Sequence, residues 1–340
     1  MTTFRAAIAL LAAIATIGCG ASPELKTESA AFAASVVADT MGSAPASVRT
    51  IALQARPELE ENSGVTSSTR QPGIIFTIND SGNDPLLFAF DSGGADRGVW
   101  RVTGARNVDW EAISVGPCGA RPADAAAAPS PAAPNACLYL GDVGDNDAQR
   151  PTRLIYRVSE PTAERAGYVG TVTAEALTYR YPDRPHDVEA MYIAPNGSTF
   201  LITKRRLTAP DRRLRPSLVF ELEASAWGNG AAPAVAERVD SLSIVPGSAP
   251  RRQVTDAALS PDGRLLAVRT YTQLFVFATD SVTGRVAGAI RPSVCNLASL
   301  GRLPGEGVAW SGRSGKLLLT SEGRRSPMFM VECPVPKTNP

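Results

Sequence analysis

Residues 254–270 read VTDAALSPDGRLLAVRT. An acidic residue followed by small and apolar residues opens this stretch, a Ser-Pro-Asp-Gly turn interrupts it, and an apolar run ending in Arg269-Thr270 closes it. Pro fixes φ where the turn begins and Gly accepts a positive φ, so this pattern is typical of a tight hairpin. The stretch therefore predicts two antiparallel strands joined at residues 260–263.

The same unit recurs along the chain. Its other openings are Trp110-Glu111-Ala112-Ile113, Val188-Glu189-Ala190-Met191, Gly305-Glu306-Gly307-Val308 and a degenerate copy, Asn62-Ser63-Gly64-Val65. Apolar second strands follow at residues 74–78, 138–140, 200–202, 265–268 and 317–319, and each ends in polar residues. One unit is longer because an Ala/Pro-rich insertion, residues 123–135, separates its two strands. Such repetition indicates a repeat architecture.

Further strands complete each unit. Third strands are expected at residues 86–90, 154–158, 218–222, 273–277 and 328–331, where several segments alternate apolar and polar residues. Fourth strands are expected at residues 99–103, 176–181, 235–239 and 286–290. The last unit lacks a fourth strand, and residues 48–53 form a strand before the first unit. We expect this N-terminal strand to complete the last sheet.

Four-stranded sheets repeated around an axis predict an all-β fold, a β-propeller of about five blades with WD40-like repeats, closed by its N-terminal strand. A sixth, degenerate blade has room between Val239 and Gln253 or within residues 30–57. A β-sandwich also strings short strands together, but it leaves the repeated acidic opening unexplained. The expected organisation is a signal peptide at 1–18, a lipidated tether at 19–46 and one propeller domain at 47–340.

The N-terminus has the pattern of an export signal. Arg5 precedes a small, apolar run over residues 6–18, which is too short to cross a bilayer. The run ends in Thr16-Ile17-Gly18-Cys19, which resembles a bacterial lipobox with Thr in place of the usual Leu. Lipidation of Cys19 predicts a membrane anchor and a place on the outer surface of a bacterial membrane or in the periplasm; the alternative is cleavage near Ala21 and free secretion.

The remaining four cysteines suit an oxidising compartment. Cys118 and Cys137 flank the Ala/Pro-rich insertion, and Cys295 and Cys333 would tie the last connection to the last strand. These are the disulfides we expect, although four cysteines allow three pairings and the sequence does not choose among them. A cysteine metal site is disfavoured, because tight Cys-x-x-Cys spacing is missing and His186 is the one histidine.

Composition excludes one class of partner. The chain has 340 residues, 34 basic against 33 acidic, and a net charge of +1. This balance gives no electrostatic footprint for nucleic acid. We expect a monomer whose ligand or protein partner the sequence does not name.

Several runs resemble a known group of proteins. They are IIFTINDSG (74–82), DWEAI (109–113), LYLGDVGDN (138–146), DVEAM (187–191), VTDAALSPDGR (254–264), VRTYT (268–272) and GEGVA (305–309). They resemble uncharacterised exported bacterial β-propeller lipoproteins and, more loosely, the phytase-like esterase propellers. The resemblance covers roughly residues 58–333 and implies an architecture, whereas chemistry has to be argued from a site.

The acidic openings are the first candidate site. The first strand of each blade lines the channel of a propeller, so the openings should converge on its axis; the residues are Ser63, Glu111, Glu189, Asp256 and Glu306. Gathered carboxylates repel one another unless a cation neutralises them, and hard oxygen ligands favour Ca²⁺. By position this ring is similar to the axial calcium site of apyrase-type nucleotidases. Alternatively, the acids bond to backbone amides or pair with Lys204 and Arg269.

The ends of the second strands predict a binding face on one side of the disc. Its candidate residues are Asp80, Asp142, Asp145, Lys204, Arg269 and Glu322. Cations beside a metal suit phosphate binding. Two functions stay open: a surface binding or scaffold propeller with an axial cation, and a Ca²⁺-dependent phosphoesterase of phytase-like or nucleotidase-like type. Whether the chain is an enzyme is undecided at this point.

Overall fold

A computed structural model describes residues 45–54, 56–119, 136–204, 216–228, 232–242, 244, 253–300, 305–312 and 315–336. All of them lie in one compact unit, Met41–Pro340. The expected signal peptide and Cys19 lie outside the described residues. Among the residues described, no helix is long and apolar enough to span a membrane.

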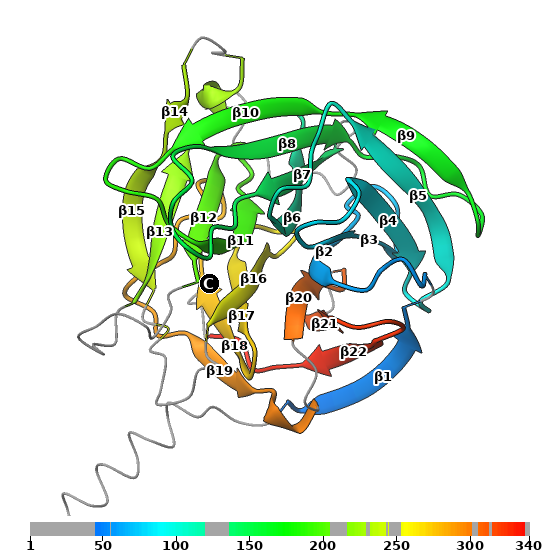
Figure 1. Ribbon diagram of the computed structural model, residues 1–340. Coiled ribbons are helices and arrows are strands. Elements are labelled where there is room, and N and C mark those ends of the chain that lie inside the picture. The colour runs from blue at the N-terminus through cyan, green and yellow to red at the C-terminus, as the bar shows by residue number, and fades with distance from the viewer. Residues whose placement is uncertain are drawn as a thin grey trace, which may run out of the picture. The chain divides into compact units, whose positions relative to one another are not determined.

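The described strands form five sheets around a central axis, a five-bladed β-propeller (Figure 1), and the first four strands of each sheet are antiparallel. Blade 1 holds β2 (Asn62–Ser67), β3 (Ile74–Asn79), β4 (Leu86–Asp91), β5 (Asp96–Thr103) and β9 (Val169–Thr173). Blade 2 holds β6 (Trp110–Pro117), β7 (Ala136–Asp142), β8 (Arg153–Ser159), β10 (Glu175–Arg180) and β14 (Ala234–Val235). Blade 3 holds β11 (Val188–Ile193), β12 (Thr199–Thr203), β13 (Ser217–Leu222) and β15 (Glu237–Leu242).

Blade 4 holds β16 (Val254–Leu259), β17 (Leu265–Thr270), β18 (Gln273–Ala278) and β19 (Ser293–Asn296). Blade 5 holds β20 (Gly305–Trp310), β21 (Lys316–Ser321), β22 (Pro327–Glu332) and β1 (Ser47–Leu53). The first strand of each blade contacts that of the next, and β20 contacts β2, so the ring is closed. The five-bladed propeller expected from the repeat is confirmed, and every described strand belongs to one of these sheets.

The N-terminal strand closes the ring as expected. β1 pairs antiparallel with β22, from Ser47 opposite Glu332 to Leu53 opposite Pro327. Blades 1 and 2 each receive a fifth, outer strand from the chain segment that builds the next blade. β9 runs parallel to β5 in blade 1, and β14 runs parallel to β10 in blade 2. These added strands cover edges that would otherwise expose unpaired backbone groups.

One expected strand is wrong. Residues 286–290 do not form the fourth strand of blade 4, because β19 pairs with β18 instead, with Cys295 opposite Leu274. Val286 makes an isolated bridge to Thr279, and the Ile290 amide donates to Ala287 O in a turn. The expected strand at 235–239 is divided between β14 and β15. β9 is an additional strand that the repeat did not predict.

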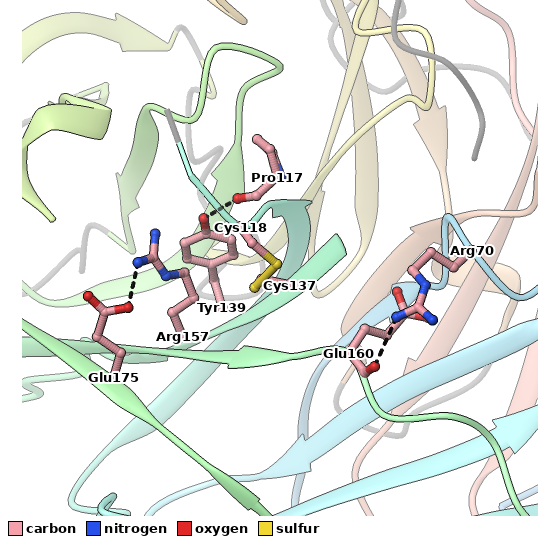
Figure 2. The surroundings of a disulfide bond; sticks show 8 residues. All are labelled: Arg70, Pro117, Cys118, Cys137, Tyr139, Arg157, Glu160 and Glu175. Carbon is pink, nitrogen blue, oxygen red and sulfur yellow. Dashed lines mark hydrogen bonds and ion pairs between the residues drawn. A yellow bond between two sulfur atoms is a disulfide. The ribbon is translucent and has the colours of Figure 1, made fainter. Parts of the chain in front are cut away.

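Both expected disulfides are present, which indicates an oxidising compartment outside the cytoplasm. Cys118–Cys137 joins the ends of β6 and β7 beside Tyr139, whose hydroxyl donates to Pro117 O (Figure 2). Cys295–Cys333 links the outer strand of blade 4 to the residue that follows β22 in blade 5. The second bridge therefore holds neighbouring blades together near the closure of the ring.

Candidate functional site

Each inner strand is irregular where the acidic unit opens. The pairing register between first and second strand shifts between Asn62 and Val65, Trp110 and Ala112, Val188 and Ala190, Val254 and Asp256, and Gly305 and Val308. A bulge of this kind frees a residue from the ladder and re-aims its side chain. Four of the expected ring residues lie within these bulges, and Asp256 lies at the edge of the fifth.

The five ring residues are all buried, and two of them meet directly. Ser63 Oγ donates to Glu111 Oε2 at 2.7 Å, across the boundary between blades 1 and 2. Glu189 raises the pKa of both Glu111 and Glu306 through its charge, in addition to the effect of burial. The first strands of the blades thus bring these acids into one electrostatic environment at the N-terminal ends of these strands, a region that we call the channel mouth.

Two ring acids are already partnered within the protein. Lys204 Nζ donates to Glu189 Oε1 at 2.5 Å, which is the ion pair considered in the sequence analysis. Asp256 accepts hydrogen bonds from the amides of Val308 at 2.8 Å, Ala257 at 2.8 Å and Val65 at 3.4 Å. Asp256 therefore joins blade 4 to blades 5 and 1 through backbone amides.

Arg269 has a similar structural role. Its buried guanidinium donates from Nη1 to the carbonyls of Gly307 and Thr320, both in blade 5. Burial lowers the pKa of Arg269 to about 10, against the opposing charges of Glu306 and Asp256. Gly305 makes room for this side chain, because a Cβ there would lie 2.3 Å from Arg269 Nη2. Arg269 was expected on a binding face but lies inside the blade contact.

A second group of acids forms at the mouth between blades 1 and 2. Asp80 follows β3, Asp109 precedes β6, and Glu111 lies in the β6 bulge; one carboxylate oxygen from each lies within 4.8 Å of the others. We call these three residues the carboxylate triad. Gly144 packs against it, since a Cβ at that position would lie 2.5 Å from Asp109 Oδ2 and 2.8 Å from Glu111 Cγ.

Burial and neighbouring acids disfavour ionisation of the triad. Burial and the charges of Asp80, Asp187 and Asp142 raise the pKa of Asp109 to about 6, although Arg150 opposes the shift. Burial also raises the pKa of Asp80, and it raises the pKa of Glu111 well above its usual range. The charge of Asp80 also disfavours ionisation of both Asp109 and Glu111. A bound cation would reverse these shifts.

The end of β7 and the loop after it support the triad through hydrogen bonds. Asp142 Oδ1 accepts from the Asp109 amide at 3.1 Å and from Arg150 Nη2 at 2.7 Å, whereas its Oδ2 is buried without a hydrogen-bond partner. Arg153, which is fully buried, pairs with Asp145, and the Asp145 amide donates to Asp187 Oδ1 at 3.0 Å. Asp142 thus holds the backbone of Asp109 in place, and Asp145 fixes the loop.

Lys204 brings a cation to the same region, where it pairs with Glu189. Burial alone would lower the pKa of the Lys204 ammonium, but Glu189, Tyr271 and Glu111 outweigh it and the pKa rises. Burial raises the pKa of Glu189 to about 8 in spite of Lys204. Glu322 is half-buried, and burial together with Asp80 raises its pKa. Among the described residues, the mouth therefore combines several carboxylates with the Lys204 ammonium group.

The structure divides the expected site residues differently from the sequence. Glu111 from the ring and Asp80 from the binding face come together, and they are joined by Asp109, which the sequence analysis did not select. A signal for Asp109 was present: DWEAI and DVEAM both place an Asp two residues before the ring Glu. Whether the ring binds a metal stays a prediction.

Comparisons with known proteins identify no family for this chain. No protein-family model matches the chain, and no curated protein matches it in sequence. Among solved structures it is similar to Myxococcus xanthus glutaminyl cyclase, with 14% identity over 85% of this chain and 97% of that chain and a TM-score of 0.45. It is also similar to a luciferin-regenerating enzyme (10% identity, 86% and 79% covered, TM-score 0.39) and to a nidogen/laminin complex (8%, 77% and 73%, 0.40). At these identities and TM-scores the similarities assign no activity to this chain.

Proposed function

We propose that this protein is an exported propeller that binds one divalent cation, Ca²⁺, at its channel mouth and acts as a binding module through that ion. The supporting observation is the carboxylate triad, whose three oxygens lie within 4.8 Å of one another. Asp80, Asp109 and Glu111 would hold the ion. Its charge would offset the burial and the neighbouring acids that raise their pKa values.

The chemistry of the donors favours Ca²⁺ over softer metals. All three groups are carboxylates, and hard oxygen donors suit Ca²⁺ and Mg²⁺, whereas thiolate and imidazole suit zinc and copper. The cysteines at 118, 137, 295 and 333 are in disulfides, and His186 bonds to Asp183. Ca²⁺ accepts six to eight coordinating oxygens in flexible geometry. The molecule that the protein binds could therefore supply the oxygens that the triad does not.

A second candidate, Ca²⁺-dependent phosphoester hydrolysis, is favoured by one observation. Lys204 places an ammonium group at the same mouth, where it would pair with a phosphate oxygen. When bound, the ion would supply Lewis-acid polarisation of the phosphoryl group.

The place of the protein in the cell forms part of the proposal. Lipid attached to Cys19 would hold the propeller at the outer surface of a bacterial membrane or in the periplasm, in agreement with the disulfides. Mass spectrometry of the membrane fraction tests this. We expect acylated Cys19 at the mature N-terminus and a soluble product from Cys19→Ser; an unmodified N-terminus near Ala21 would contradict it.

Calorimetric titration tests the cation. We expect the full chain, freed of metal by a chelator, to bind one Ca²⁺, and Asp109→Asn to weaken binding at least tenfold. Asp147→Asn is the matched control, because Asp147 lies in the supporting loop but is exposed. No saturable binding, or equal binding by the two variants, would contradict the proposal.

An activity assay separates the two candidates. The calcium-loaded protein and Lys204→Met are incubated with phosphomonoesters, nucleotides and inositol phosphates. Calcium-dependent turnover that Lys204→Met abolishes would establish the hydrolase. Calcium binding without turnover of any of these esters supports the binding module.

A further inference from the structure

A small cavity lies between blades 3 and 4, away from the channel mouth. It has a volume of about 90 Å³ and is lined by Tyr192, Phe200, Val219, Val239, Asp240, Arg285 and Val286. Tyr192 is three residues along β11 from Glu189, which separates the two regions by about 10 Å along the strand. The cavity therefore offers a site distinct from the carboxylate triad.

The apolar wall of the cavity is rigid and aromatic. Tyr192 and Phe200 face each other across β11 and β12, with ring centroids 4.8 Å apart and planes 4° from parallel. The Tyr192 hydroxyl donates to Gly284 O at 3.1 Å, which fixes its ring. Aromatic surfaces of this kind attract cations as well as apolar groups.

The polar lining consists of Arg285 and Asp240, and of these two only Arg285 has an ion-pair partner among the described side chains. Arg285 is neutralised by Glu221, since its Nη2 donates to Glu221 Oε2 at 2.6 Å. Asp240 Oδ1 accepts from the Ser241 amide at 2.7 Å, and no ion pair joins Asp240 to another described side chain. A ligand with a positive head group would complete this lining.

We infer that the cavity between blades 3 and 4 binds a small alkylammonium group, held by Asp240 and by the Tyr192–Phe200 wall. Size limits the ligand: a cavity of about 150 Å³ accommodates benzene, so 90 Å³ takes a shorter group, such as the end of an aliphatic amine. An anion would face the Asp240 carboxylate, and a neutral alcohol would leave that charge unpaired. An alkylammonium ion can pair with the Asp240 carboxylate and pack against the Tyr192 and Phe200 rings.

Two-dimensional NMR of the full chain, saturated with Ca²⁺ to occupy the channel mouth, tests the inference with ethylammonium as the probe. We expect saturable shifts at the amides around Val239, with a dissociation constant on the order of millimolar for a ligand of three heavy atoms. Ethanol and acetate should bind at least tenfold more weakly. No saturable shift, or equal binding of ethanol, would overturn the inference.

Variants locate the binding. Asp240→Asn should weaken ethylammonium binding at least tenfold, whereas the control Glu237→Gln, an exposed acid on the same strand, should change it less than twofold. If Asp240→Asn does not fold, Val239→Phe decides instead, because its ring would fill the cavity and abolish binding. Unchanged binding in a folded Asp240→Asn or Val239→Phe protein would contradict the site. Calcium binding at the triad should be unaffected by these variants. The experiments can therefore contradict the alkylammonium site without contradicting the calcium site, and the reverse.

Discussion

The carboxylate of Asp256 in blade 4 accepts a hydrogen bond from the amide of Val308 in blade 5 at 2.8 Å. The same oxygen also accepts from the Val65 amide in blade 1, so one buried side chain joins three blades. A repeated acid can therefore stabilise a propeller without binding any ligand.

Asp256→Ala should strongly destabilise the protein. It leaves two inter-blade amides buried without an acceptor, and each costs about 1–3 kcal/mol, so we expect a loss of about 3 kcal/mol in the free energy of unfolding. Urea denaturation measures it, with the exposed Asp147→Ala as control. A loss below about 1 kcal/mol would show that these hydrogen bonds do not hold the blades together.

The disulfide between blades 4 and 5 should contribute more to stability than the one at the insertion. Cys295–Cys333 closes a sequence separation of 38 residues and Cys118–Cys137 one of 19. Loop-closure entropy gives about 4 and about 3 kcal/mol for the two bridges. Thermal unfolding of Cys295→Ser/Cys333→Ser and Cys118→Ser/Cys137→Ser measures the difference, and a larger loss from the second pair would contradict this ranking.

Asp109→Asn should stabilise the metal-free protein at neutral pH. The pKa of Asp109 is raised to about 6, so the folded state binds a proton more tightly than the unfolded state does. Stability therefore falls as pH rises from about 4 to about 6 and stays lower above that range. Removing the charge should raise the free energy of unfolding at pH 7.5 by about 1 kcal/mol. The gain is this small because solvent partly screens the group. Urea titrations at pH 4 and pH 7.5 measure this, and equal effects at the two values would contradict it.

Calcium binding should weaken on acidification for the same reason. The triad must be ionised to hold the ion, and protons compete for it. A single group with a pKa of about 6 lowers the affinity about fourfold between pH 7.5 and pH 5.5, and the raised pKa values of Asp80 and Glu111 add to this. Calorimetric titrations at the two pH values measure the change; a pH-independent affinity would exclude the triad as the ligand set.

Gly144→Ala should weaken calcium binding although it removes no ligand. Its Cβ would lie 2.5 Å from Asp109 Oδ2, so the carboxylate has to move and the triad opens. We expect at least a tenfold loss of affinity by calorimetry. Gly288→Ala is the control, because a Cβ there meets no atom within 4 Å. Equal affinities for the two variants would show that the triad geometry is unimportant.

Much of the fold could be predicted from the repeat. Acidic openings, Pro-Gly turns and alternating strands are local features, and they located the first three strands of each blade and the closing strand. The outer strands were harder. β9 follows β8 of blade 2 but pairs with β5 of blade 1, and nothing in its short sequence states its partner. In blade 4, residues 286–290 are small and apolar, as in a buried strand, yet Gly288 lies in a turn closed by Ala287 and Ile290, and Ser293–Asn296 occupy the edge of β18.

The site was predicted less completely than the fold. Repetition suggested that equivalent residues have equivalent roles, but Asp256 bonds to amides, Glu189 pairs with Lys204, and Glu111 joins the triad. These differences depend on neighbours that are distant in sequence, such as Gly144 behind Asp109. The repeat identifies which residues approach the axis, and the surrounding loops decide what each one does.

The most direct test of the central claim is an anomalous difference map from crystals of the protein grown with Ca²⁺. We expect one strong peak among Asp80, Asp109 and Glu111, at about 2.3–2.6 Å from a carboxylate oxygen of each. The absence of a peak there, or a peak on the channel axis held by Ser63, Glu189 and Glu306 without Asp109, would contradict the proposed cation site.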